Sequence, residues 1–359
     1  MASTWPIPPS VREMPYQEIP DSPTEKYYTD WRKYEEKLNL GEATSLDPIY
    51  LRTGNCVIKG NSPYTHDCTG ISTSPWKVEE IPTKERMAAY HVYRKPAGFE
   101  ITIEQEGDYT LLLPGGNGYT GYTLKVSTEP MVKANLTIID TALQHGLKTQ
   151  FIEIQVGGQS QLDVTHLVAH TENAPVYTFV KAGGGEGSRL IYRAGGRPGE
   201  MTRLRIDSLL NKPYSRVDGV LGFSSRGRSI GDIIFNVAHI APHTVSLVSG
   251  NGVAREESKL TMRGTARVSH TAGSSRTRVE MHVIIVGDKA KGRSVPMLEI
   301  YTGEVEEASH SASATTIGEN ILFYAATRGL ERGDLELLLE RGVFEKAGVA
   351  RIMEELGLA

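Results

Sequence analysis

The chain changes character within one stretch, Ser309-His310-Ser311-Ala312-Ser313-Ala314-Thr315-Thr316-Ile317-Gly318-Glu319-Asn320-Ile321-Leu322-Phe323-Tyr324-Ala325-Ala326-Thr327-Arg328-Gly329-Leu330. Before this stretch, short strand-like segments alternate with glycine-rich turns, and after it apolar residues recur at helical spacing. A single histidine, His310, lies among small residues at the junction. The order of these features divides the sequence into a β-rich body and a short helical tail.

The body, about residues 98–308, consists of strand patterns separated by turn residues. Apolar and β-branched residues are concentrated in segments such as 150–156 and 232–237, and glycine clusters such as 183–187 separate such segments. No pattern of helical period interrupts the series, which excludes a βαβ fold and leaves a sandwich, a barrel or a stacked β-solenoid. A solenoid buries only a narrow row of side chains in each coil and so suits short strands and many glycines, but the residues alone do not separate the three architectures.

The tail contains three helix patterns. The first is predicted to run from an N-cap at Thr315 or Thr316 to Gly329. Its apolar face consists of Ile317, Ile321, Leu322, Tyr324 and Ala325. A second helix is predicted over residues 334–341, with the following glycine as its end, and a third over residues 344–356. A solenoid exposes its ends and requires caps, so we expect these helices to form the C-terminal cap.

The N-terminal part shows two patterns. Residues 1–22 are rich in proline and polar side chains, which predicts an extended or poorly ordered arm. Residues 24–38 carry aromatic and apolar side chains at helical intervals, which predicts one amphipathic helix. The residues at these intervals are Tyr27, Trp31, Tyr34 and Leu38. An apolar stripe of this kind packs against a protein body more often than it binds a partner, so we expect it to be buried.

The charge balance and the apolar runs limit the classes of protein. The chain has 359 residues, with 39 lysines and arginines against 43 aspartates and glutamates, for a net charge of −4. This balance gives no overall field that would attract nucleic acid or an anionic membrane. Apolar runs such as residues 282–286 are far too short to span a bilayer, and the opening residues lack the pattern of a signal peptide. We therefore expect a soluble cytoplasmic protein that binds neither nucleic acid nor membranes.

Three blocks of sequence, in a fixed order, resemble a known family. Residues 262–268 and 294–300 look like strands with the patterns x-G-x-x-x-V and S-x-P-x-L-E-I, and residues 309–330 follow with the histidine motif. This order is similar to the C-terminal signature of SufB and SufD, the scaffold proteins of the SUF iron-sulfur assembly system. The resemblance covers about the last hundred residues. Ser309 and Ser311 flank the histidine where SufB has glutamates, so the motif looks closer to SufD.

The resemblance implies a fold and a domain order. SufB and SufD are built around a right-handed parallel β-helix, so we expect a mainly β protein with such a solenoid at residues 98–311. Residues 1–97 are expected to form an N-terminal arm with a mixed, partly helical segment. Residues 312–359 are expected to form a small helical domain, which in the family docks onto the ABC-type ATPase SufC. The residues offered for this contact are Leu322, Phe323, Tyr324 and Arg328; for the first two, the alternative is that they only pack the helices together.

The histidine motif is also a candidate site for an iron-sulfur cluster. Thiolates, imidazoles and carboxylates all ligate iron, and imidazole ligation suits a site that must release its cargo. The resemblance makes His310 the candidate ligand, with His282, Glu306 and Glu307 as weaker candidates. The β-rich body contains no cysteine, so one copy cannot build a four-thiolate cluster and would share a transient cluster with a partner subunit. The alternative is that His310, near a domain edge, is an ordinary surface residue.

Only two cysteines occur, Cys56 and Cys68, with His66 beside the second. One interpretation is a metal site made by these three residues, and the other is a pair of loop thiols or one disulfide. A zinc site normally needs a fourth ligand and closer cysteine spacing, which favours the second interpretation.

The resemblance implies a non-enzymatic SUF component that dimerises, with itself or with a SufB or SufD paralogue, and binds SufC-like ATPases. Residues 183–189 lack the Gly-Lys-Ser/Thr ending of a phosphate loop, so we expect no nucleotide on this chain. One alternative is a SufD-like subunit that only supports a separate SufB. Another is a polysaccharide-active β-helix enzyme using Glu100, Glu104 and Glu106, although alternation on a strand explains these acids as a solvated face.

Overall fold

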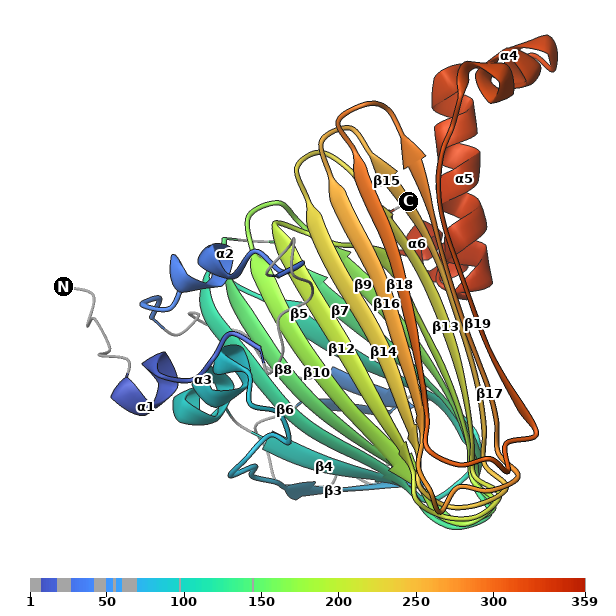
Figure 1. The fold of residues 1–359 in the computed structure, drawn as a ribbon. Helices are drawn as coiled ribbons and strands as arrows, with labels where there is room; N and C mark the ends of the chain where they lie inside the picture. Colours follow the sequence, from blue (N-terminus) through green and yellow to red (C-terminus); the bar gives the residue numbers. More distant parts are fainter. Residues whose placement is uncertain are drawn as a thin grey trace.

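Two long sheets form the body of the protein (Figure 1). The computed structural model describes residues 8–17, 27–41, 50–53, 56–59, 70–96, 98–143 and 145–358. From β4 onward, even-numbered strands lie in one sheet and odd-numbered strands in the other, so each pair of consecutive strands makes one coil. The protein is mainly β, a parallel β-solenoid of about eight turns, which confirms the fold class expected from the family resemblance.

The strands of the solenoid pair in parallel, whereas three short strands at its N-terminal end pair antiparallel. The ten-stranded sheet contains β1 (Tyr50–Thr53), β2 (Cys56–Lys59), β5 (Gly107–Gly115), β7 (Lys133–Ala142), β9 (Gln161–His170), β11 (Arg189–Arg197), β13 (Arg216–Ser225), β15 (Val245–Arg255), β17 (Arg276–Val286) and β19 (Glu307–Thr316). The nine-stranded sheet contains β3 (Ile71–Pro75), β4 (Gly98–Ile103), β6 (Gly118–Thr128), β8 (Gly146–Val156), β10 (Pro175–Gly184), β12 (Met201–Leu210), β14 (Ile230–His239), β16 (Lys259–Val268) and β18 (Lys291–Ile300).

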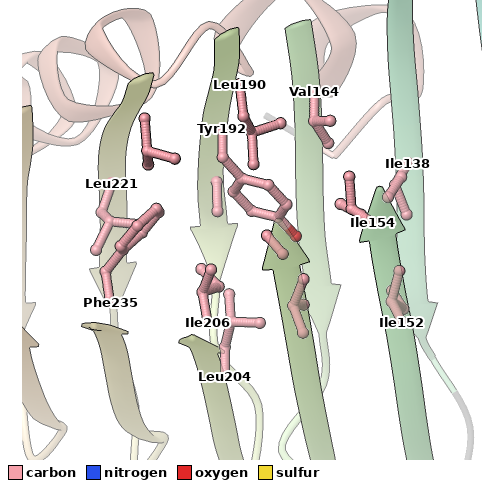
Figure 2. Packing of buried hydrophobic residues seen from close by; sticks show 14 of the residues in the cluster. Ile138, Ile152, Ile154, Val164, Leu190, Tyr192, Leu204, Ile206, Leu221 and Phe235 are labelled. Carbon is pink, nitrogen blue, oxygen red and sulfur yellow. The ribbon is translucent and has the colours of Figure 1, made fainter. Parts of the chain in front are cut away.

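Columns of apolar side chains fill the space between the sheets (Figure 2). One column, fully buried and in register on successive strands, consists of Ile152, Val180, Ile206 and Phe235. Across the core, the Tyr192 ring of β11 lies edge-on to Phe235, with 6.2 Å between the ring centroids. Each buried side chain of this size contributes about 1.5–3 kcal/mol, so the repeated columns, rather than any single contact, hold the coils in register.

The coils share one corner with a left-handed backbone, two residues before each odd-numbered strand from β7 to β17. The corner residues, all with positive φ, are Met131, Gln159, Gly187, Tyr214, His243 and Ser274. Hydrogen bonds link adjacent corners, as from Gln159 N to Glu186 O at 2.9 Å. Gly187 therefore serves the turn of one coil, and this position accounts for part of the glycine cluster at residues 183–187.

The N-terminal segment packs on the outer face of the nine-stranded sheet (Figure 1). Its helices are α1 (Pro9–Arg12), α2 (Trp31–Glu35) and α3 (Arg86–Arg94). The helix predicted over residues 24–38 is shorter than expected, because the chain turns after α2. The predicted burial of the aromatic stripe is confirmed for Trp31, Tyr34 and Leu38. Sequence patterns did not predict α3, and α1 falls in the stretch predicted to be extended.

A buried ionic network fastens this segment to the sheet. The Arg203 guanidinium on β12 lies 2.5 Å from Glu85 Oε1 and 2.5 Å from Asp232 Oδ2, and all three side chains are at most 3% exposed. Thr29 donates a hydrogen bond to Asp232 at 2.6 Å. Burial by itself raises the pKa of Glu85, but Arg203 and Arg205 hold it below its usual value. The network therefore keeps both carboxylates ionised while joining the N-terminal segment to two strands.

A second ionic group is enclosed between the two sheets. Lys148 of β8 forms an ion pair with Asp140 of β7, and both side chains are 1% exposed. Gln150 donates a hydrogen bond to Asp140 at 2.7 Å, and His170 Nε2 lies 3.2 Å from the same carboxylate. Burial by itself raises the pKa of Asp140, but Lys148 and then His170 hold it well below its usual range. Asp140 is therefore a buried anion whose main countercharge is Lys148.

Three helices follow the last strand: α4 (Glu319–Thr327), α5 (Arg332–Lys346) and α6 (Ala350–Glu355). Their number agrees with the prediction, but α4 begins after Gly318, which makes no side-chain cap, and not after Thr315 or Thr316. The reason is that β19 continues to Thr316, beyond residue 311 where we expected the boundary of the core. Among the described helices, none has the length and apolar character needed to cross a membrane.

The second helix of the tail is also longer than predicted. It passes through Gly342 and ends at Lys346, so the last helix begins at Ala350 rather than at residue 344. A glycine inside a helix costs about 1 kcal/mol relative to alanine. Burial of Val343 and Phe344 against the solenoid outweighs that cost. Packing therefore overrides the stop signal that the sequence carries.

Candidate functional site

The last coil, made by β18 and β19, ends the solenoid without a cover. Within the described ranges, no strand pairs with the outer edge of either strand. Their residues are exposed or half-buried, whereas most residues of the preceding coils are buried. The helix α5 packs on β11, β13 and β15 and so leaves this end open. Positions that face the core in earlier coils therefore face solvent here.

His310 lies within this open end. The pairing of β19 with β17 places His310 at the register position of Val279, and Ala312 at that of Met281, both of which are buried core residues. His310 itself is exposed, because no further coil follows. Ala312 and Ala314 share its face of the strand and are small. The small residues of the motif therefore leave the imidazole accessible at the end of the core.

The weaker candidate His282 lies on the other face of the sheet. It pairs in register with Ser313, and its Nδ1 lies 2.9 Å from Ser313 Oγ. Ser313 is three residues from His310 on the same strand, and side chains alternate between faces along a strand. The structure therefore does not bring His282 and His310 together.

The two candidate acids form ion pairs with arginines. Glu306 lies 2.5 Å from Arg276 Nε, and Glu307 lies 2.6 Å from Arg278 Nη2. Both pairs are about half exposed, and such pairs contribute at most about 1 kcal/mol to stability. The structure gives these acids a place in a surface ladder of ion pairs rather than a position beside His310.

The cysteines lie apart from His310 or outside the described residues. Cys56 belongs to β2, at the opposite end of the ten-stranded sheet from β19. Cys68 and His66 lie outside the described residues, so both interpretations of these three residues stay predictions. In the described part of the chain, no group of three or more His, Cys, Asp and Glu side chains is placed to hold a metal ion.

The acids of the polysaccharide alternative do not share one strand. Glu100 lies in β4 and forms an ion pair with Lys125 at 2.6 Å. Glu104 and Glu106 follow the end of that strand and are exposed. The expectation that the three acids alternate on a strand is therefore wrong, because β4 ends at Ile103.

Aromatic side chains are exposed on α4, which projects beyond the sheets (Figure 1). Phe323 is 72% exposed and Tyr324 is 60% exposed. The Arg328 guanidinium lies 5.3 Å from the centre of the Tyr324 ring. Leu322 is half-buried and lines a hollow of about 500 Å³ between α4 and the start of α5. Packing within the tail thus explains the partial burial of Leu322, but it gives no role to the exposed side chain of Phe323.

Two further apolar residues of the tail were not predicted to be exposed. Leu337 and Leu338 of α5 are 60% and 52% exposed. The sequence offers one signal for them, a run of leucines at 337–339 that is too wide for a single buried face. Exposed apolar side chains therefore occur on both α4 and α5.

An ionic clamp holds α5 against the ten-stranded sheet. Glu340 is 3% exposed and accepts hydrogen bonds from Arg197 Nε and Arg255 Nη2, each at 2.6 Å. The helix backbone also lies very close to β13, because a Cβ atom on Gly222 would be 2.0 Å from Val343 O. The clamp and the close approach fix α5 as an extension of the solenoid.

A comparison with known protein families identifies the family to which the solenoid belongs. Residues 120–343 match the family described as SUF system FeS cluster assembly, SufBD core domain. This match covers more than half of the sequence, including the uncovered coil and His310. The chain belongs to the SufBD family. The same span of this SufBD protein includes α4 and most of α5.

Curated relatives carry the same family name. An iron-sulfur cluster assembly SufBD family protein of Mycobacterium leprae is 22% identical over 254 residues, which cover 69% of this chain and 28% of that protein. The iron-sulfur cluster assembly protein SufB of Bacillus subtilis is 25% identical over 107 residues, which cover 30% of this chain and 23% of that protein. The matched part of the SufBD chain thus spans less than a third of either relative. The closeness to SufD at the histidine motif stays a prediction.

Proposed function

We propose that this SufBD protein is a non-enzymatic, cytoplasmic component of the machinery that assembles iron-sulfur clusters. Two copies, or this chain and a SufB or SufD paralogue, pair through the open ends of their solenoids. A SufC-like ABC ATPase docks on the C-terminal helices of each. The cluster is cargo, held transiently where the open ends meet. The observation that carries this proposal is that the histidine of the family motif lies within the uncovered last coil.

The open end has the properties of a pairing surface. β18 and β19 each present ten residues at a sheet edge, and exposed edges of this length readily pair with another chain. Ile300 is 42% exposed at the same end, although its register partner Val268 is fully buried in the preceding coil. A two-fold pair would cover both edges and bring one His310 from each copy toward the joint.

The tail has the properties of a docking surface. Exposed aromatic and arginine side chains are enriched among residues that dominate protein-protein binding, and α4 offers Phe323, Tyr324 and Arg328 together. The clamp at Glu340 joins this surface to the solenoid. A displacement of the docked ATPase would therefore act on the strands under α5, and ATP hydrolysis would belong to the partner.

Replacing both Phe323 and Tyr324 with alanine is expected to weaken binding of a SufC-like ATPase by about 30-fold or more, since two exposed anchors of this kind together contribute about 2 kcal/mol or more. Isothermal titration calorimetry measures the effect on the full chain. Arg351→Ala is the matched control, because this side chain is 88% exposed on α6. Equal affinity of the double variant and the wild type would place the ATPase elsewhere and contradict the proposal.

Anaerobic reconstitution with iron and sulfide tests the scaffold role. We expect a charge-transfer band in the visible spectrum of the wild type with the ATPase present, and loss of that band in His310→Ala, because an imidazole ligand is removed. His270→Ala, which removes another exposed histidine, should keep the band. If the ATPase binds but the wild type forms no band, the chain is the SufD-like structural subunit and His310 is not a ligand.

A further inference from the structure

A cleft of about 820 Å³ lies beside helix α3, at the first strands of the nine-stranded sheet. Part of its lining is the segment 73–79, which contains the end of β3 and the residues that follow it. The rest comes from the end of α3 and from β4 and β6. β3 and β4 lie at the end of this sheet opposite β18 (Figure 1). The cleft is therefore separate from the open end of the solenoid and from the helical tail.

Apolar side chains make up much of the lining. They are half-buried or exposed, and they are Pro75, Trp76, Val78, Val92, Pro96 and Phe99. Trp76, Val78 and Val92 pack against the apolar cluster that joins the N-terminal segment to the sheet, and Phe99 packs against the core between the sheets. The parts of these side chains that stay exposed line the cleft. A concave, mainly apolar lining and a volume of this size are typical of sites for small ligands.

Contacts with the sheet hold the cleft in shape. The Trp76 N–H donates a hydrogen bond to Gly98 O at 3.0 Å, and one face of the Trp76 ring stacks on Phe151, with 5.8 Å between the ring centroids. On α3, His91 is fully buried, and its Nε2 lies 3.0 Å from Thr123 Oγ1. A site that is held in shape before binding loses little conformational entropy when a ligand enters. The cleft therefore does not have to be built by its ligand.

Two lysines and one glutamate supply the charge of the lining. Lys77, Lys95 and Glu79 all line the cleft and are exposed. Among the described residues, none of the three has an ion-pair partner, whereas Lys125 on the neighbouring β6 pairs with Glu100 at 2.6 Å. Two positive charges against one negative charge leave an excess of one positive charge at the cleft. The lining thus combines an apolar surface with a single excess positive charge at its exposed residues.

We propose that this cleft binds an amphipathic carboxylate, a single carboxyl group on an apolar chain, as in a free fatty acid. The chain lies against the apolar residues of the lining, and the carboxylate lies at Lys77 and Lys95. A carboxylate carries one negative charge at neutral pH, which equals the excess charge of the lining, whereas a phosphate monoester carries up to two. Lysine side chains cover apolar surface with their stems and keep their ammonium groups in water. The carboxylate therefore stays near solvent while the chain is buried.

Titration calorimetry of the full chain, without ATPase, tests the site with dodecanoate as the probe. We expect saturable one-to-one binding of dodecanoate, and binding of acetate at least about a hundredfold weaker, since acetate has no chain to bury. Dodecanol, which has the chain but no charge, should bind about fivefold more weakly, because exposed charge pairs contribute little. The double variant Lys77→Gln and Lys95→Gln should bind dodecanoate about fivefold more weakly, and it should bind dodecanol as the wild type does.

Tryptophan fluorescence shows where the chain of the ligand lies. The sequence contains three tryptophans, of which Trp76 lines the cleft and Trp31 is buried elsewhere. A brominated dodecanoate should quench the emission of the wild type as it saturates the site, because the bromine quenches a ring that it contacts. In Trp76→Phe, which keeps an aromatic ring in the lining, most of this quenching should be lost, while the affinity measured by calorimetry stays within about twofold.

The matched control is the double variant Lys133→Gln and Lys212→Gln, which removes the same charge from two exposed lysines outside the lining. It should bind dodecanoate as the wild type does, and circular dichroism should show the same fold for all variants. The proposal would be overturned by absence of saturable binding, by dodecanol binding as tightly as dodecanoate, by equal affinities of the two double lysine variants, or by quenching that persists in Trp76→Phe. These outcomes do not depend on whether the chain binds an ATPase or a cluster.

Discussion

Arg203→Met is expected to lower the free energy of unfolding by about 3 kcal/mol, because breaking a buried ion pair leaves carboxylates without their countercharge. Glu85 and Asp232 would remain buried at 1% and 0% exposure. Each keeps one other arginine, Arg205 or Arg263, which places the cost at the lower end of the usual range for such changes. Urea unfolding followed by circular dichroism measures the difference.

The same substitution should also release the N-terminal segment before the solenoid unfolds. Arg203 contacts Thr29 at 3.1 Å as well as both carboxylates, so hydrogen exchange of residues 27–41 should become faster in the variant. Arg267→Met is the control, because its pair with Glu299 is on the surface and is expected to contribute at most about 1 kcal/mol. A loss for Arg203→Met no larger than that of the control would show that the network does not hold the segment.

Lys148→Met is expected to cost about 3–5 kcal/mol, since it leaves Asp140 as a buried anion without its main countercharge. The lysine also donates a hydrogen bond to Thr141 O at 3.1 Å, and this carbonyl would lose that partner. The group lies between the sheets, and both side chains are 1% exposed, so the missing charge is not screened by bulk solvent. Chemical unfolding of the full chain measures the loss, and we expect it to exceed the effect of Arg203→Met.

A double substitution separates charge from packing at this position. Asp140→Asn combined with Lys148→Met removes both charges and keeps an oxygen for the hydrogen bond from Gln150, so it should be about 1–2 kcal/mol more stable than Lys148→Met alone. Lys125→Met serves as a control, because its pair with Glu100 is more than a quarter exposed on both sides. A double variant less stable than Lys148→Met would mean that packing, not the unpaired charge, sets the cost.

The sequence patterns predicted the strand-rich body, but they did not distinguish a solenoid from a sandwich or a barrel. The reason is visible in the column of Ile152, Val180, Ile206 and Phe235. These residues share one register position, yet they differ in type and follow one another at unequal intervals. A solenoid needs only an apolar side chain of suitable size at each inward position, so no repeated motif is required. The family resemblance therefore had to supply the architecture.

For the candidate site too, the sequence predicted some features and missed others. The motif identified His310, and the structure places it in the uncovered coil. The sequence could not show that His282 and His310 lie on opposite faces of the sheet, because the face of a side chain depends on strand register, and a shift of one residue reverses it. Glu340 was missed, since its partners Arg197 and Arg255 are 143 and 85 residues away in the sequence. Contacts over such distances leave no local pattern.

The two ends of the solenoid differ in a way that limits growth. At the N-terminal end, the outermost of the described strands in the two sheets, β2 and β3, are four and five residues long and run antiparallel to their neighbours. At the other end, both outermost strands have ten residues. A rod with an exposed pairing edge at each end would polymerise into a fibre, as amyloid does. If two copies pair through their long end strands as proposed, that joining would cover the exposed edges of both copies in the first step, and the resulting pair could not elongate.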